Sequence, residues 1–299
     1  MTAATISLSE AAAVAAVDQF GLLQVTEATA RWMRQGIARL ARHCGAATVD
    51  QVKPAHVAAW IEAERGGAAG HVSINSQLRA VKVVFSRLER RGLVVDNPAR
   101  PVPFLREPAA MPKAIAAGDY LAMRAAATIA RDRAILDVLW ASGCRLGGLL
   151  SMRVDRGRIE HWRDSAGRDC FALLVVEKYD KPRWVYVGRE RLQGDGLAAW
   201  LAERPASTDP ALFLTMTGEP RAIAASTVEG VIRRLRIAAG IGDRPAHAHA
   251  FRHAFALRML DQGVDLSAVS AWLGHHSPEF TAARYAVRSE SALREKYFK

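Results

Sequence analysis

The sequence predicts a mainly α-helical chain of two domains, with one small β-sheet in the second domain. Apolar residues recur at helical spacing along most of the 299 residues, as in the run Ile74, Leu78, Val81. Between residues 158 and 187 the apolar period changes to two, which is typical of strands. A segment at 97–112 contains five prolines in sixteen residues and shows no periodicity. Such a segment indicates an extended, fairly stiff linker between two parts.

The first part, residues 1–107, is expected to be a small bundle of four helices with arginine-rich outer faces. The helices are predicted at 7–23 with Ser7 or Ser9 as N-cap, from Thr26 to Cys44, from Pro54, and from Ser73 to Gly92. Residues 108–112 are predicted to complete the linker.

The second part, residues 113–299, is expected to combine helices with a small sheet. Helices are predicted at 117–127, 129–142, around 228–236, and at 249–262, 265–273, 278–286 and 289–298, with strands at 158–162, 171–177 and 184–187. The turn between the last two strands carries Lys178 and Lys181. Near residue 230, an apolar stripe lies opposite Arg233, Arg234 and Arg236, which favours a helix lying on DNA.

Charge points to a polyanionic partner. The net charge is +11 and the pI is about 10.1, with an excess of four basic residues before Pro112 and of seven after it. Three widely spaced cysteines favour a reducing, cytoplasmic environment. The Ala/Val-rich residues 3–17 lack a basic leader and are interrupted by Glu10, so we expect neither a signal peptide nor a membrane span.

Histidines concentrate near the C-terminal end, because five of the nine lie between Arg244 and Tyr285. His249 precedes Arg252 by three residues, and Gly274-His275 precedes Tyr285 by ten. A histidine, an arginine, a second histidine and a tyrosine can together hold a phosphate and attack it. The spacing of His247, His249 and His253 also suits zinc, but Arg252 inside that cluster would repel a cation, so we expect no metal.

These residues resemble the motifs of the tyrosine recombinase (phage integrase) family, in the family's order. Ser142-Gly143-Cys144-Arg145 matches S/T-G-x-R, and the hairpin lysine motif, of the type G-K-x-x-K-x-R, is matched by Glu177-Lys178-Tyr179-Asp180-Lys181-Pro182-Arg183. His249-Ala250-Phe251-Arg252 matches H-x-x-R, Leu273-Gly274-His275 matches L-G-H, and Arg284-Tyr285 matches the nucleophile motif.

The resemblance implies a helical, SAM-like core-binding domain, a linker, and an α+β catalytic domain ending in a tail helix. It also implies a site-specific recombinase that acts in the cytoplasm, at the nucleoid. Its partners would be double-stranded DNA with an inverted-repeat core site and further copies of the chain in a synaptic tetramer, and no cofactor is implied.

The resemblance assigns a role to each motif residue. Tyr285 would attack the scissile phosphate and form a 3′-phosphotyrosine. Arg145 and Arg252 would bind the non-bridging oxygens, because a guanidinium matches them in a bidentate way. His249 would accept the tyrosine proton, and Lys178 would protonate the departing 5′-oxygen. His275 would donate a hydrogen bond to the same phosphate.

Two positions depart from the family pattern. An acidic residue usually stands three after the first arginine, where this chain has Gly148, so His249 must be oriented by something else. The histidine-to-tyrosine spacing is more often nine than ten, and His276 fits nine, although His275 directly follows Leu-Gly.

Two other functions remain open at this point. The first is a type IB topoisomerase, which uses the same chemistry on one duplex. The second is a DNA-binding protein that has lost catalysis, and the best evidence for it is Gly148 at the position of the usual acidic residue. The sequence gives neither the DNA target, nor the element served, nor any accessory protein.

Overall fold

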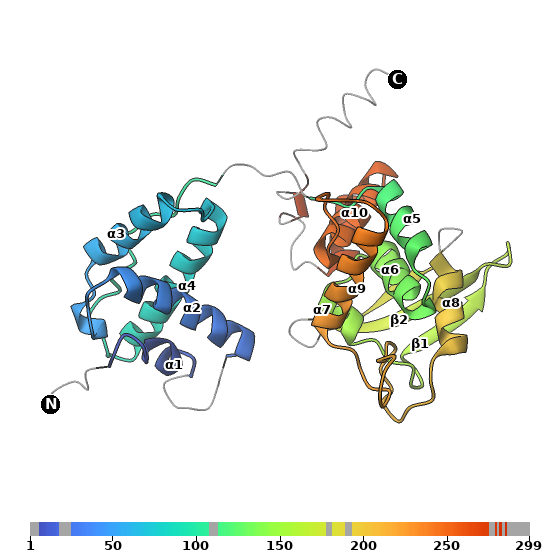
Figure 1. The fold of residues 1–299 in the computed structure, drawn as a ribbon, viewed down its shortest axis with the longest axis horizontal. Coiled ribbons are helices and arrows are strands. Elements are labelled where there is room, and N and C mark those ends of the chain that lie inside the picture. Colours follow the sequence, from blue (N-terminus) through green and yellow to red (C-terminus); the bar gives the residue numbers. More distant parts are fainter. Residues whose placement is uncertain are drawn as a thin grey trace, which may run out of the picture. The chain divides into compact units, whose positions relative to one another are not determined.

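The computed structural model describes residues 6–17, 25–107, 113–177, 181–188 and 193–274, together with residues 279, 281–282 and 285. The chain divides into two compact units, Met1–Ala109 and Ala110–Lys299 (Figure 1). Within the described ranges, no helix is both long enough and apolar enough to cross a membrane. The predicted architecture of helices with one small sheet is confirmed.

The first unit is built around its longest helix, α4. Its elements are α1 (Ala11–Ala15), α2 (Glu27–His43), the 3-10 turn η1 (Val49–Gln51), α3 (Pro54–Arg65) and α4 (His71–Arg90). Helices α1, α2 and α3 all pack on α4. Ile74, Leu78, Val81 and Phe85 of α4 are fully buried, as the helical spacing predicts.

Two predictions for this unit were wrong. Helix α1 begins at Ala11 and not at residue 7, because Ser7 forms a bridge with Thr48 and its hydroxyl donates to the Glu10 carboxylate. Residues 97–107 do not form a free linker. Asn75 of α4 donates to the Leu105 carbonyl and accepts from the Leu105 amide, both at 2.8 Å, so this segment packs along the helix. The predicted linker 108–112 lies outside the described residues.

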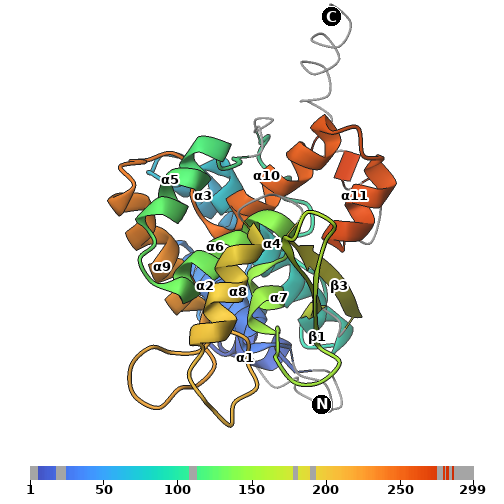
Figure 2. The same cartoon turned by 90° about the vertical axis from the view of Figure 1, so that its right-hand side faces the viewer.

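The second unit places a sheet and several helices around α6. Its helices are α5 (Ala117–Ala126), α6 (Ala130–Ser142), α7 (Leu146–Leu150), α8 (Gln193–Glu203), α9 (Ala225–Ala238), α10 (Ala248–Asp261) and α11 (Leu266–Leu273). Helix α6 packs against α8, α10 and β3 (Figure 2). Nearly all of its residues are buried, which fits its place at the centre of the unit.

The sheet is antiparallel, in the order β1–β2–β3. Its strands are β1 (Ile159–Arg163), β2 (Asp169–Glu177) and β3 (Lys181–Val187). The register pairs Glu177 with Lys181, so β2 and β3 form the predicted hairpin, while residues 178–180 lie outside the described ones. Helices α7 and α8 were not predicted, because α7 is short and glycine-rich and α8 follows a segment without clear periodicity.

Candidate active site

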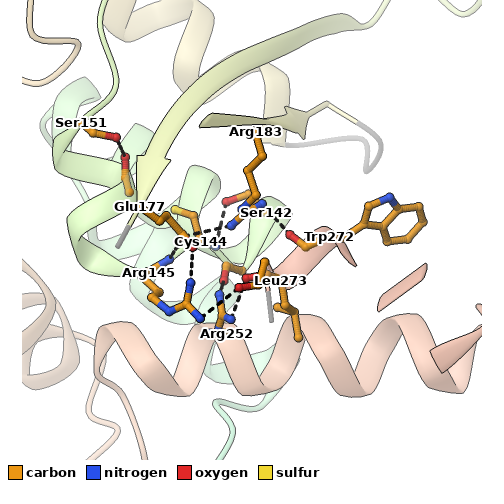
Figure 3. Close-up of polar contacts among 12 residues, drawn as sticks. Ser142, Cys144, Arg145, Ser151, Glu177, Arg183, Arg252, Trp272 and Leu273 are labelled. Atoms are coloured by element: carbon orange, nitrogen blue, oxygen red, sulfur yellow. Dashed lines mark hydrogen bonds and ion pairs between the residues drawn. The ribbon is translucent and has the colours of Figure 1, made fainter. Parts of the chain in front are cut away.

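Arg145 lies at the junction between two helices. Helix α6 ends at Gly143, which adopts the left-handed conformation with φ of 56°, and Arg145 is the N-cap of the following helix α7. A Cβ on Gly143 would also lie 2.7 Å from the Phe255 ring. Only glycine meets both conditions, which explains the glycine of the S-G-x-R pattern. The tight turn leaves the Arg145 side chain partly exposed beside Glu177 (Figure 3).

Arg252 approaches the same place from helix α10, and its residue is only 2% exposed. Its Nη1 donates to the Gly143 carbonyl at 2.9 Å and its Nη2 to the Leu273 carbonyl at 2.7 Å (Figure 3). These carbonyls lie at the C-terminal ends of α6 and α11, where the helix has no partner for them. Burial, followed by the charge of Arg145, lowers the pKa of Arg252 to about 10, so the guanidinium remains charged at neutral pH.

Glu177, the last residue of β2, joins two arginines. Its Oε1 accepts from the Arg145 backbone N–H at 3.0 Å and from Arg183 Nη2 at 3.0 Å, and its Oε2 accepts from the Arg145 guanidinium. The side chain is 6% exposed. Burial opposes ionisation of Glu177, but Arg183 and Arg145 outweigh it and lower the pKa of its carboxyl. Glu177 is therefore an ionised group at the centre of the cluster.

Arg183 links the hairpin to helix α11. One terminal nitrogen binds Glu177, and the other donates to the Trp272 carbonyl. Helix α11 ends at Gly274, which is left-handed with φ of 65° and whose carbonyl accepts from Arg145 Nη2 at 3.3 Å. The positive φ favours glycine at position 274, and an added Cβ would also lie only 3.0 Å from Arg183 Nε. Neither Glu177 nor Arg183 had a predicted role, although both stand in the hairpin motif.

Tyr285 is 3% exposed and packs with residues of α10 and α11. Its hydroxyl lies 2.9 Å from Nδ1 of His253, the residue after Arg252. The His253 ring meets the His249 ring edge-on, with centroids 4.7 Å apart. His249 was predicted to accept the tyrosine proton, but it is His253 whose Nδ1 lies 2.9 Å from the Tyr285 hydroxyl. His249 and His253 are four residues apart on α10, so their rings lie on the same face of the helix. This spacing was the feature of the sequence that could have indicated a role for His253.

His247 has a structural task. It is the N-cap of α10, and its Nδ1 accepts from the Ala250 amide at 3.1 Å. Burial lowers the pKa of His247, with a further contribution from Lys113. Among the described residues, no group of three His, Cys, Asp or Glu side chains is placed to hold a metal ion.

An open pocket of about 850 Å³ lies beside the arginines, between α7, α9 and the start of α10. Its lining includes Arg145, Arg233, Arg236, His247 and His249. The predicted apolar stripe of α9 is buried, which leaves its arginines facing outward. The pocket lining thus contains three arginines, two histidines and one carboxylate, that of Glu229.

Of the predicted site residues, Arg145 and Arg252 lie together at the C-terminal ends of α6 and α11. Tyr285 lies close enough to Arg252 to influence its pKa. His249 lies next to His253. Lys178, His275 and His276 lie outside the described residues, so their predicted roles and the choice between the two histidines stay predictions.

The sequence matches the model of the phage integrase family over residues 113–291. It is 32% identical to tyrosine recombinase XerC of Alcanivorax borkumensis over 221 residues, which is 71% of this chain and 67% of that protein. It is also 32% identical to XerC of Ralstonia pickettii over 257 residues, 79% of this chain and 76% of that protein.

Solved structures share the fold. XerH recombinase bound to its difH substrate aligns with a TM-score of 0.69 at 17% identity, covering 88% of this chain and 78% of XerH. A lambda integrase dimer bound to a core site aligns with a TM-score of 0.69 at 16% identity, covering 94% of this chain and 77% of that chain. With the family model spanning more than half of the sequence, this chain belongs to the phage integrase family of tyrosine recombinases.

Proposed function

We propose that this protein carries out site-specific DNA recombination, cutting and rejoining DNA strands through a 3′-phosphotyrosyl intermediate. The observation that carries the proposal is that Arg145 and Arg252 lie together at the ends of α6 and α11, with Tyr285 near Arg252. Tyr285 lies close enough to Arg252 to influence its pKa. A phosphate held by the two guanidinium groups would therefore lie beside the nucleophile.

The reaction is a transesterification in two equivalent steps. The Tyr285 oxygen attacks phosphorus as the bond to the 5′-oxygen breaks, and the guanidinium groups stabilise the extra negative charge of the transition state. The tyrosine proton passes to a histidine, for which the 2.9 Å contact makes His253 a candidate beside His249. Lys178 protonates the departing 5′-oxygen, and His275 donates a hydrogen bond to the phosphate. Attack by a 5′-hydroxyl of another strand reverses these steps.

The substrate in this proposal is double-stranded DNA with an inverted-repeat core site, bound by a tetramer. Structural relatives include lambda integrase as a tetramer on a Holliday junction and XerH on a palindromic site. The net charge of +11 and the outward arginines of α9 suit a DNA backbone. The proposed division of labour gives core binding to residues 1–107 and catalysis to residues 113–299. On this basis the protein works at the nucleoid.

The two alternatives have less support. Gly148 favoured a catalytically impaired DNA-binding protein, because an acidic residue is expected at that position. However, the ionised carboxylate of Glu177 occupies the space where a side chain at position 148 would lie. For a type IB topoisomerase, the discriminating observation is whether the DNA complex contains one protomer or several. Sedimentation of the protein with a full core site distinguishes the two.

The nucleophile provides the direct test. Tyr285→Phe removes only the hydroxyl, so folding and DNA binding should persist while covalent complexes vanish. The measurement is the denaturant-resistant protein–DNA adduct formed on a nicked suicide substrate. Wild-type protein is the positive control, and an adduct formed by the Phe variant would show that another residue attacks.

A further inference from the structure

The space beside Gly148 is already occupied. A Cβ added at Gly148 would lie 2.9 Å from Glu177 Oε1 and 3.2 Å from Glu177 Cγ. The carboxylate cannot simply move aside, because the Arg145 amide, the Arg145 guanidinium and Arg183 all hold it. At neighbouring Gly147, an added Cβ would meet nothing within 4 Å. Position 148 is therefore glycine for a specific reason, the presence of Glu177.

The bond from the Arg145 amide to Glu177 resembles one half of a capping box. Arg145 is the N-cap of α7, and Gly148 is the third residue of that helix, the N3 position. A glutamate at N3 commonly reaches back to accept from the N-cap backbone N–H. Here the N3 residue has no side chain, and the N-cap N–H donates to Glu177 from strand β2, at 3.0 Å. A carboxylate from a distant strand thus makes the bond that an N3 glutamate would make.

The consequence reaches both arginines of the phosphate site. The Glu177 carboxylate fixes the Arg145 backbone and binds its guanidinium. Its charge also raises the pKa of Arg252, against burial and the neighbouring arginines that lower it. Through Arg183 and the Trp272 carbonyl it connects β2, β3 and α11.

We infer that Glu177 is the acidic positioning residue of this active site, and that it replaces a carboxylate at position 148. The inference rests on the proposed DNA cleavage, because it assigns a residue that orients the phosphate-binding arginines for that reaction. It also explains two departures together: the motifs have an acid where this chain has Gly148, and a glycine where it has Glu177. The two residues have exchanged places in sequence while the carboxylate has stayed in one place in space.

The first test removes the charge and keeps the shape. Glu177→Gln should lower the rate of adduct formation, measured at saturating protein on the suicide substrate, by about 10²-fold, because misplaced catalytic groups cost that much. DNA affinity should stay close to the wild-type value, since Glu177 is an acid and donates nothing to the phosphates. Glu160→Gln, an exposed glutamate of the same sheet, is the matched control and should cleave normally. Normal cleavage by Glu177→Gln would overturn the inference.

The second test restores the carboxylate from the other side. Glu177→Gly and Gly148→Glu should each cleave poorly, the first for lack of a carboxylate and the second because two carboxylates compete for one space. The double variant should recover about tenfold or more over Glu177→Gly, which is a non-additive outcome that general damage to folding does not produce. A double variant no better than Glu177→Gly would show that position 148 cannot supply the group, and would overturn the exchange.

A third test stays informative even if the Glu177 variants fold poorly. Gly148→Ala adds only the Cβ that displaces the carboxylate, so it should slow cleavage, while Gly147→Ala should not. Equal rates for the two alanine variants would count against the inference. Wild-type protein is the control in every assay. If the wild type itself formed no adduct, the proposed DNA cleavage would be refuted, and not only the role of Glu177.

Discussion

Arg145 and Arg252 lie close enough for their charges to interact, but different kinds of group hold them in place. The Arg145 side chain is 38% exposed and pairs with the carboxylate of Glu177. Arg252 is 2% exposed, and the contacts recorded for its guanidinium are with two neutral carbonyls, those of Gly143 and Leu273. Arg145 is therefore bonded to a full counter-charge at the edge of the pocket, whereas Arg252 is bonded to helix-end carbonyls in the interior.

The difference shows how the site keeps positive charge for a substrate. Carbonyls at the C-terminal end of a helix carry partial negative charge, so they orient a cation without cancelling it. Among the described residues of this cluster, three guanidinium groups, those of Arg145, Arg183 and Arg252, surround the single carboxylate of Glu177. The excess positive charge is available to a phosphate, which is the ligand that guanidinium groups fit.

Lysine at each of the two positions gives the largest expected effect. Arg252→Lys should slow adduct formation by about 10³-fold, because one ammonium cannot reach two carbonyls and a phosphate, and burial disfavours its charge. Arg145→Lys should cost about 10²-fold, since a lysine there stays partly exposed and can still pair with Glu177. The measurements are the rate of adduct formation on the suicide substrate and the melting temperature. The melting temperature should be lower for Arg252→Lys than for Arg145→Lys. A larger rate loss for Arg145→Lys than for Arg252→Lys would contradict the difference proposed between the two arginines.

The two histidines of α10 provide a second test, close to Arg252. His253→Ala should reduce adduct formation by about 10²-fold, because it removes the ring nitrogen that lies 2.9 Å from the Tyr285 hydroxyl. His249→Ala should reduce it less. Both variants should bind DNA, which a mobility-shift assay checks. A larger loss with His249→Ala would return the proton-acceptor role to that residue.

The smallest expected effect is on acid stability. The pKa of the Glu177 carboxyl is lowered from its usual 4.5, so its ionised form stabilises the fold above that pH, and this stabilisation is lost as the pH falls below it. Between about pH 6 and about pH 3, the melting temperature of the wild type should therefore fall more than that of Glu177→Gln. Glu160→Gln should follow the wild type. Parallel curves for Glu177→Gln and the wild type would mean that the pairing with Arg145 and Arg183 contributes little.

Local patterns in the sequence determined most of the elements. The stripe of Val228, Val231, Ile232 and Leu235 predicted a helix with one buried face, and all four side chains are buried in α9. The change to a period of two predicted the β2–β3 hairpin. These predictions succeed because a helix or a strand that covers a core repeats its apolar side chains at its own period. The order of the motifs, in turn, identified Arg145, Arg252 and Tyr285 as residues that belong together.

Only the tertiary structure decided how those residues are held. Glu177 lies 32 residues from Arg145, and Arg183 lies 89 residues from Trp272, yet both pairs are bonded. No local period records such a contact, because it depends on how a strand end, a helix start and a helix end pack together. The same holds for Gly148, which in the sequence indicated a missing carboxylate and in the structure leaves room for one. A side chain's position in space can thus be kept while its position in the chain changes, since the bonding groups respond only to where the carboxylate lies.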